Sequence, residues 1–183
     1  MMRNLILIAL EQEAPTMASW DNVFFTGVGK VNAGITAGKL IEKYKPEVVW
    51  NFGTAGGISV NQGIHEIKNF VQRDMLCSDL GFDEGQTPFE DHTVISFGDI
   101  INDMCCSTGD NFVSSEQDDW VITDVVDMEA YAIAKACKKA DVDFKCFKYI
   151  SDSADKNASS DWKETVADGE KYYITIYNDN KEK

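Results

Sequence analysis

Three acidic residues lie at points where the chain changes from one expected element to the next. Glu13 follows an apolar run within Leu10-Glu-Gln-Glu-Ala14, Glu129 lies between an expected strand and an expected helix, and Asp152 ends another apolar run. Carboxyl groups at such places can give or take a proton, or bind a pair of hydroxyls. An arbitrary acid is more often a solvated surface residue or a helix cap. A functional interpretation therefore depends on whether the fold brings the three together.

Three apolar runs predict the strands that would bring these acids together. Residues 4–10 and 47–52 are continuous apolar runs, and residues 144–150 form a third, in which Lys145 and Lys148 are interleaved. Such runs are typical of strands in a sheet that is covered on both faces. Residues 31–44 have apolar positions near helical spacing and predict a helix between the first two strands. All three acids would then lie at the carboxyl edge of one sheet.

A second strand–helix–strand unit is expected in the C-terminal half. A short apolar pair leads into an alanine-rich helix over residues 128–140 and then into the third strand. Residues 153–161 are polar and predict a loop. Residues 162–177 predict a closing helix, although their tyrosine-rich portion has strand propensity, and residues 178–183 are expected to be frayed. Because no repeat or linker divides the chain, residues 1–183 are predicted to form a single α/β domain.

Two glycine-rich segments follow expected strands, where backbone N–H groups can meet an anion or a ligand oxygen. Gly27-Val-Gly-Lys30 lacks the distal glycine and the hydroxyl residue of a Walker A loop, and the next glycine, Gly34, comes too late for a dinucleotide fingerprint. A tight turn with a helix cap explains this segment equally well. Phe52-Gly-Thr-Ala-Gly-Gly57 is expected to be a turn that closes a buried strand and lets a ligand approach the backbone.

Composition excludes several classes of partner and site. The 183 residues include 31 acidic and 17 basic side chains, and the formal charge of −14 repels nucleic acids and anionic membranes. No apolar run approaches the ~20 residues of a membrane-spanning helix. Arg3 and Arg73 are the only arginines, which excludes a phosphate site built from several arginine forks. Five cysteines without a C-x-x-C pair, and two isolated histidines, favour a reducing cytosol and argue against a disulfide framework or a metal site.

Four segments, in order along the chain, resemble one family. They are Gly27-Val-Gly-Lys-Val-Asn-Ala33, Phe52-Gly-Thr-Ala-Gly-Gly57, Val126-Asp-Met-Glu-Ala130 and Ile150-Ser-Asp-Ser-Ala-Asp155. Together they resemble the purine nucleoside phosphorylase and uridine phosphorylase superfamily, and within it the 5′-methylthioadenosine/S-adenosylhomocysteine nucleosidases. The resemblance implies a three-layer α/β sandwich with a central twisted mixed sheet flanked by helices. It also implies a cytoplasmic homodimer that works in methionine salvage without metal or organic cofactor.

The resemblance gives each of the three acids a role. Glu13 matches the carboxylate that activates the attacking water, Glu129 the acid that binds the ribose hydroxyls, and Asp152 the acid that protonates the purine at N7. Breaking an N-glycosidic bond builds positive charge on the sugar and negative charge on the purine. A buried, partly protonated Asp152 and an ionised Glu129 suit these roles. A carboxylate with its water on the other face of the sugar supplies the nucleophile, as in inverting glycosidases.

The resemblance also implies six contacts with a nucleoside substrate. They are Thr54 near the ribose and the water, Met128 against the sugar, Phe112 and Val113 at the base, Ser151 paired with the general acid, and Trp162 as an aromatic over the base. The chain is shorter than usual members of the family, with the loss between Phe82 and Thr123. The 5′ substituent of the substrate therefore stays open.

Three alternatives to a hydrolase stay open at this point. A phosphorylase of the same fold would need cations where this chain has Glu11 and Glu13, which would repel phosphate, although Lys30 keeps that interpretation open. A non-catalytic nucleoside-binding relative would need Glu129 but no general acid at Asp152. A purely structural domain would need none of the three acids. The sequence favours hydrolysis of the N-glycosidic bond of a purine nucleoside, with adenine as the expected base.

Overall fold

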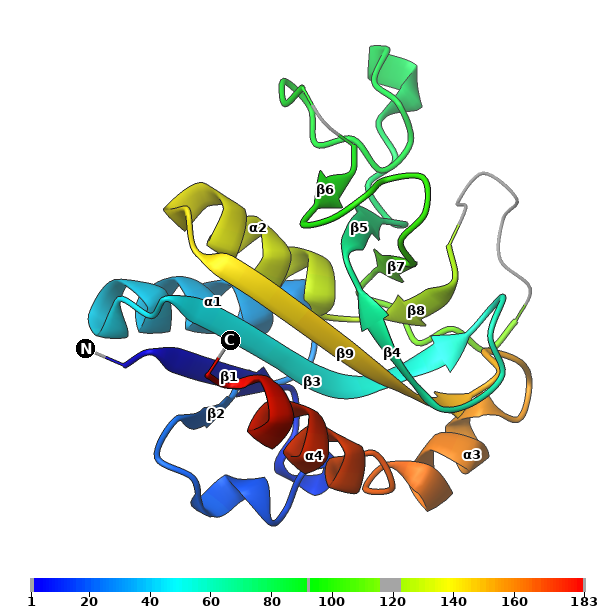
Figure 1. Ribbon diagram of the computed structural model, residues 1–183. Helices are drawn as coiled ribbons and strands as arrows, with labels where there is room; N and C mark the ends of the chain where they lie inside the picture. The colour runs from blue at the N-terminus through cyan, green and yellow to red at the C-terminus, as the bar shows by residue number, and fades with distance from the viewer. Residues whose placement is uncertain (1, 92, 116–122, 183) are drawn as a thin grey trace.

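A mixed sheet of nine strands runs through the part of the chain that the computed structural model describes, residues 2–91, 93–115 and 123–182 (Figure 1). The strands are β1 (Asn4–Ile8), β2 (Val23–Phe25), β3 (Val48–Gly57), β4 (Ile64–Ile67), β5 (Asn69–Gln72), β6 (Ile95–Ser96), β7 (Cys105–Thr108), β8 (Val125–Asp127) and β9 (Asp143–Asp152). The helices are α1 (Lys30–Tyr44), α2 (Ala130–Ala140), α3 (Ala158–Thr165) and α4 (Glu170–Asn180).

The strand order explains how distant segments meet at one place. The main path of the sheet is β2-β1-β3-β8-β7-β5-β6, and β9 pairs with both β3 and β4. β3 runs parallel to β1 and β9 but antiparallel to β8. The sheet is therefore mixed, and β3 is the strand that connects its N-terminal part to β8 and β9.

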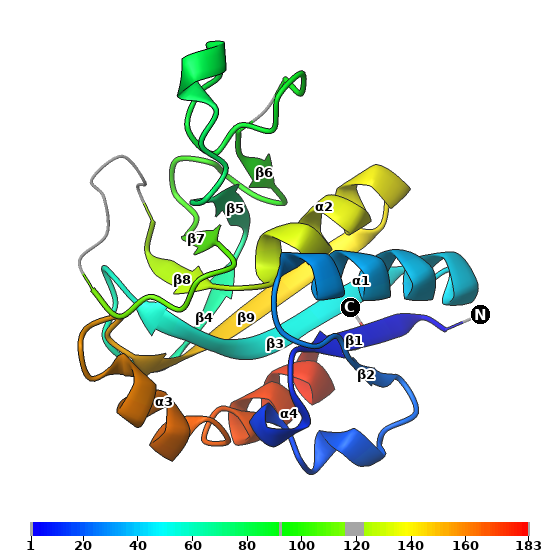
Figure 2. The same ribbon diagram turned by 180° about the vertical axis from the view of Figure 1, so that it is seen from behind.

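Alternating side chains of β1 face two hydrophobic cores, which defines the layers of the molecule. Leu5 and Leu7 belong to the core beneath α1 and α2, whereas Ile6 and Ile8 belong to the core beneath α4. Figure 2 shows α1 and α2 side by side over one face of the sheet, with α3 and α4 on the other side. The expected three-layer α/β sandwich with a central mixed sheet flanked by helices is confirmed.

The C-terminal segment differs from the prediction, because burial outweighs strand propensity. Residues 162–177 do not form one helix: α3 begins at Ala158, within the expected loop, and α4 is a separate helix that continues to Asn180. Tyr173 and Tyr177 lie four residues apart on α4, and they contact Phe52 and Trp50 in the core. This packing holds the tyrosine-rich segment as a helix.

The segment from Phe52 to Gly57 is strand rather than the expected turn. β3 pairs with β9 from Val48 to Gly56, and Gly56 and Gly57 pair with β8. Pairing with β9 on one side and β8 on the other thus keeps this segment extended. The helix expected over residues 128–140 begins at Ala130, whose backbone N–H donates to the carboxylate of Asp127 at 2.8 Å.

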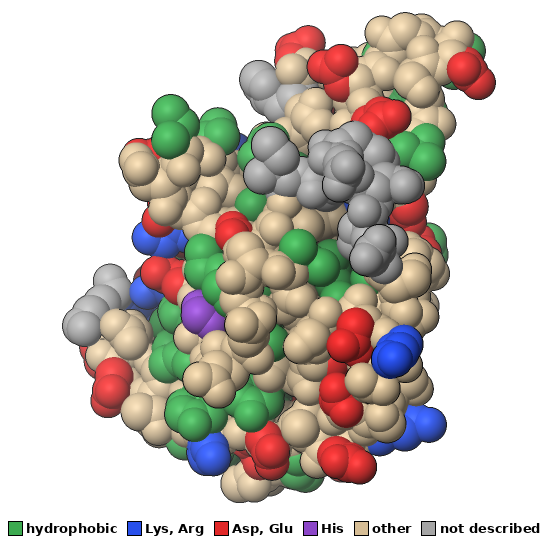
Figure 3. All heavy atoms as spheres, turned by 90° about the vertical axis from the view of Figure 1, so that its right-hand side faces the viewer, with side chains coloured by type: hydrophobic (Ala, Val, Ile, Leu, Met, Phe, Trp, Pro, Cys, Tyr) green, Lys and Arg blue, Asp and Glu red, His purple; other side chains and the backbone are tan. Residues whose placement is uncertain are grey.

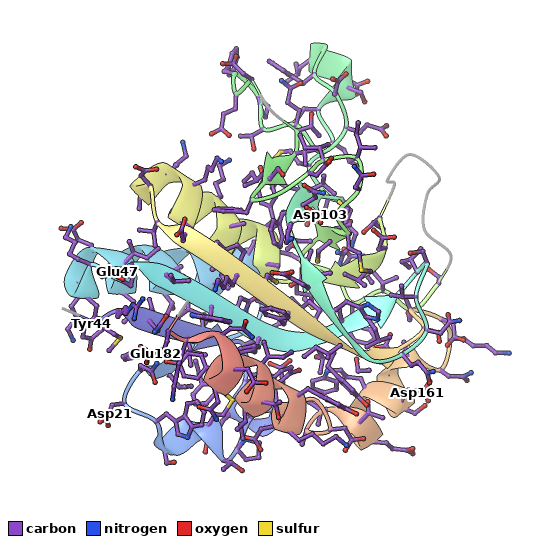
Figure 4. The ribbon with its side chains drawn as sticks, viewed as in Figure 1. Asp21, Tyr44, Glu47, Asp103, Asp161 and Glu182 are labelled. Atoms are coloured by element: carbon purple, nitrogen blue, oxygen red, sulfur yellow. The ribbon has the colours of Figure 1, made fainter. Side chains whose placement is uncertain are left out.

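The two ends of the described chain meet at one side of the molecule. The guanidinium of Arg3 donates to Glu47 at 3.1 Å and to Glu182 at 3.3 Å, and both acids are labelled in Figure 4. Acidic side chains are scattered over the face in Figure 3, where basic ones are few and marginal, in keeping with the formal charge of −14. Among the described helices, none is long and apolar enough to cross a membrane.

Candidate active site

All nine residues that the sequence singled out line one cavity of about 180 Å³. They come from the turn after β1, from β3, from the loop after β7, from the start of α2, from the end of β9 and from α3. The nine are Glu13, Thr54, Phe112, Val113, Met128, Glu129, Ser151, Asp152 and Trp162. Arg73 and Asp127, for which the sequence analysis predicts no role in the site, also line this cavity.

Glu13 is held as a hydrogen-bond acceptor by Leu10, which follows β1, and by Thr54 on β3. It ends a short 3₁₀ turn after β1 and is 3% exposed. Its Oε1 accepts bonds from both the N–H and the hydroxyl of Thr54 at 2.8 Å, and its Oε2 accepts one from the N–H of Leu10 at 3.0 Å. The indole N–H of Trp162 donates to the same Thr54 hydroxyl at 3.0 Å. Because an indole N–H can only donate, the Thr54 proton is left to point at Glu13.

A β-bulge places Ser151 and Asp152 on the same cavity. Consecutive residues of a regular strand point to opposite faces. Here the register between β3 and β9 shifts at this point, so that Ala55 pairs with Ile150 and Gly56 pairs with Asp152. Ser151 is the extra residue, and bulges re-aim side chains in this way. Its hydroxyl donates to Asp152 Oδ2 at 2.7 Å.

The surroundings of Asp152 favour its protonated form. Burial raises the pKa of its carboxyl, while hydrogen bonds from the Ser151 hydroxyl and the Ala154 N–H act in the opposite direction and only partly offset it. The close packing needs a glycine beside it, since a Cβ on Gly56 would lie 2.9 Å from Asp152 Oδ1. A carboxyl of this kind can serve as a proton donor.

Glu129 lies at the N-terminus of α2 and faces the glycine turn before α1. Its Oε1 accepts a hydrogen bond from the Gly29 N–H at 2.8 Å. Burial, and then the charge of Asp127, raise the pKa of Glu129 to about 7, against the opposing effect of Lys148. The ionised Glu129 that the sequence analysis expects stays a prediction, and a pKa of about 7 makes its charge depend on pH near neutrality.

Lys148, which no sequence pattern explained, forms a buried ion pair beneath this site. Its ammonium lies 2.9 Å from Asp127 Oδ2, and both side chains are almost fully buried. Lys148 pairs in register with Gly53 on β3, and a Cβ there would lie 3.3 Å from its ammonium, so the glycine leaves it room. The other Asp127 oxygen accepts the Thr108 hydroxyl at 2.6 Å. The one signal in the sequence was a lysine within an apolar strand.

Apolar side chains also line the cavity. Val113 is buried and packs with Val126 and Ala154 in a small cluster of its own. Phe112 is 46% exposed, and Met128 is partly buried. These apolar side chains suit the flat, mostly apolar face of a base or a sugar ring.

Cations near the cavity are occupied by protein groups. Arg73 is the only lysine or arginine among the described lining residues, and its guanidinium donates to four backbone carbonyls. Lys30 donates to Asp74 and Gln72. Within the described ranges, no group of three or more His, Cys, Asp or Glu residues is placed to hold a metal ion.

Comparison with known proteins places this geometry in context. A model of the phosphorylase superfamily matches residues 22–173. A 5′-methylthioadenosine/S-adenosylhomocysteine nucleosidase of Bacillus cereus is 32% identical over 159 residues, covering 73% of this chain and 68% of that protein. One from Exiguobacterium is 31% identical over 161 residues, with the same coverage.

Solved structures share the fold at lower sequence identity. A Helicobacter pylori MTAN mutant with 5′-methylthioadenosine in its active site has a TM-score of 0.85 and 19% identity, covering 98% of this chain and 99% of that one. Native futalosine hydrolase of the same species has a TM-score of 0.84 and 19% identity, covering 97% and 98%.

Proposed function

Because the chain belongs to the phosphorylase superfamily, we propose that it is a nucleosidase that hydrolyses the N-glycosidic bond of an adenine nucleoside. The relatives from Bacillus cereus and Exiguobacterium are named for 5′-methylthioadenosine and S-adenosylhomocysteine, which are the proposed substrates. The observation that carries the proposal is a pair of acids in one cavity whose surroundings differ. Glu13 is held as an acceptor by Thr54, whereas Asp152 has a raised pKa. Hydrolysis of this bond needs both a base and an acid.

Asp152 is the proposed general acid. As the bond between C1′ of the sugar and N9 of the base breaks, its electron pair moves into the purine. A proton from Asp152 at N7 neutralises that charge. The Ser151 hydroxyl, 2.7 Å from Oδ2, then stabilises the carboxylate that remains. Since the acid must carry its proton, activity should fall as pH rises through the pKa of Asp152.

Glu13 is the proposed general base. It takes a proton from a water molecule while the oxygen of that water bonds to C1′. The sugar is therefore released with a hydroxyl group on C1′. The two bonds from Thr54 and one from Leu10 fix the carboxylate before the water arrives. Thr54 is thus proposed to position Glu13, and its hydroxyl also lies beside the cavity in which the ribose would sit.

The other lining residues are proposed to hold the nucleoside. Glu129 in its ionised form accepts the two ribose hydroxyls, and Met128 packs on the sugar. Phe112 and Val113 contact the base, and Trp162 covers it while its N–H bonds Thr54. Holding the nucleoside in this position lowers the entropic part of the activation barrier for cleavage.

Phosphorolysis is disfavoured by the partners of the nearby cations. A phosphate nucleophile needs free positive charge beside the sugar. The two terminal nitrogens of Arg73 donate to carbonyls, Lys148 is paired with Asp127, and Lys30 is paired with Asp74. Glu13 would repel the anion. Water is therefore the proposed nucleophile.

Adenine release from 5′-methylthioadenosine, S-adenosylhomocysteine, adenosine and inosine, with and without phosphate, tests the proposal. The expected result is phosphate-independent release, with Asp152→Asn lowering kcat by about 10²–10⁴-fold. Asp168→Asn, at an exposed acid between α3 and α4, is the matched control and should keep full activity. Sugar 1-phosphate as product would make the chain a phosphorylase. Tight nucleoside binding without release would make it a non-catalytic binder.

The assembly and cellular setting are proposed from the family relationship. We propose one domain over residues 1–183, acting as a cytoplasmic homodimer in methionine salvage, on the strength of the family relationship. Five free cysteines, with Cys106, Cys137 and Cys146 buried, are consistent with a reducing compartment. A formal charge of −14 opposes binding to nucleic acid or to an anionic membrane.

A further inference from the structure

The loop that follows β7 is folded around the guanidinium of Arg73. One terminal nitrogen donates to the carbonyl of Ser107 at 2.6 Å and to that of Asp127 at 2.8 Å. The other donates to the carbonyls of Gly109 at 3.2 Å and Asn111 at 2.6 Å. Arg73 is 7% exposed, so this buried cation is bonded to backbone groups of two separate segments.

Asp74, the residue after Arg73, also holds the loop that follows β7. The Asp110 N–H donates to Asp74 Oδ2 at 2.8 Å. The Asp110 carboxylate in turn accepts the backbone N–H of Lys30, at the start of α1, at 2.7 Å. Arg73 and Asp74, directly after β5, therefore hold the carbonyls and an amide of one short loop. The loop has little freedom to move relative to β5.

The hydrogen bonds of Arg73 end on the backbone of two walls of the cavity. The base wall is Phe112 and Val113, and the sugar wall is Met128 and Glu129. The Asn111 carbonyl directly precedes Phe112 and Val113, which are proposed to contact the base. The Asp127 carbonyl directly precedes Met128 and Glu129, which are proposed to contact the sugar. One rigid, planar fork thus spans the backbone of the two walls.

The Arg73 side chain packs closely against Gly109. A Cβ on Gly109 would lie 2.9 Å from Arg73 Cγ, Cζ and Nε. Lysine cannot reproduce this contact set, because its ammonium is a single point on a flexible stem, whereas the four carbonyls lie around a planar fork.

We propose that Arg73 is a positioning residue that sets the spacing between the base wall and the sugar wall of the nucleoside cavity. This inference rests on the proposed function. Arg73 acts through the backbone of Asn111 and Asp127 and needs no contact with the substrate. Its role is separate from binding phosphate, which is the task that an arginine commonly performs near a sugar.

Arg73→Ala and Arg73→Lys test this assignment through adenine binding and steady-state kinetics with 5′-methylthioadenosine. Loss of the spacing is expected to raise the Kd for adenine and the KM by about tenfold or more, with kcat within about threefold of wild type. Low millimolar guanidinium should lower the KM of Arg73→Ala again, because the ion can occupy the vacated position. Arg73→Lys should lie between wild type and alanine and should not respond to guanidinium.

Arg3→Ala is the matched control, since Arg3 is the only other arginine and bonds exposed Glu47 and Glu182. It should keep the wild-type KM with and without guanidinium. Folded Arg73→Ala with wild-type adenine affinity and KM would overturn the assignment, as would a loss in kcat alone without guanidinium rescue. If Arg73→Ala does not fold, Arg73→Lys with wild-type KM and wild-type adenine affinity would overturn the assignment equally. Adenine binding requires no turnover, so an inactive wild-type protein would refute the proposed hydrolysis and leave this comparison intact.

Discussion

Glu129→Gln is expected to make the protein more stable at alkaline pH while it removes activity. The wild-type carboxyl is 8% exposed, and burial, the charge of Asp127 and that of Glu13 raise its pKa, while Lys148 and the Gly29 N–H lower it. Glutamine can still accept the bond from Gly29 but has no charge to bury. The folded state is thereby relieved of a penalty that the unfolded chain does not carry.

The size of the effect follows from the shift of this one group. A rise in pKa from 4.5 to about 7 on folding destabilises the ionised protein by about 3 kcal/mol near pH 8. Since the folded pKa is the higher one, the penalty is absent below the unfolded value of 4.5, grows as pH rises toward 7, and is complete above it. The gain from glutamine is therefore about 3 kcal/mol near pH 8 and under about 1 kcal/mol near pH 5. At the higher pH it corresponds to about 6–12 °C in Tm.

Urea unfolding and calorimetry at both pH values measure this gain, with Glu42→Gln as an exposed control that should change stability by under about 0.5 kcal/mol. The same variant should lower kcat/KM by about 10²-fold or more, because two charge-assisted bonds to the ribose are lost. A variant that is no more stable than wild type at pH 8, or whose gain is equal at pH 5, would refute the reasoning.

Two further predictions concern the groups around the acids. Lys148→Met leaves the buried Asp127 carboxylate unpaired and should lower the free energy of unfolding by about 3–5 kcal/mol in urea titrations. Asp127→Asn combined with Lys148→Met should recover most of that loss, and a double variant as unstable as the single one would contradict the pairing. Trp162→Phe keeps an aromatic ring but removes the donor to Thr54, so kcat should fall about threefold to tenfold with KM within about twofold. A higher KM at unchanged kcat would assign the effect to the ring and not to the positioning of Glu13.

Local patterns were enough to predict an α/β domain and to single out the three acids, whereas the three-layer arrangement and the roles of the acids came from the family resemblance. Apolar runs marked β1, β3 and β9, and the first and third of these runs end close to Glu13 and Asp152. Glu129 lies at the expected change from strand to helix, between β8 and α2. Such patterns depend on neighbours along the chain, which a single sequence records directly.

Features that depend on distant partners could not be found in the same way. Lys148 finds Asp127 only because β8 and β9 both pair with β3, and the fork of Arg73 joins β8 to the loop after β7. The bulge at Ser151 is a shift in register between two strands, and no local composition signals it. Tyr173 is helical because it packs on Phe52, against its own propensity.

Identity of the nucleophile is the most direct test of the account. The purified protein would be incubated with 5′-methylthioadenosine in ¹⁸O-labelled water containing excess phosphate, and the sugar product would be analysed by mass spectrometry. Activation of water by Glu13 predicts a free sugar that carries one ¹⁸O atom, together with adenine and no sugar 1-phosphate. A sugar 1-phosphate product would contradict the account, because it would require a phosphate site where Glu13 and the paired cations leave none.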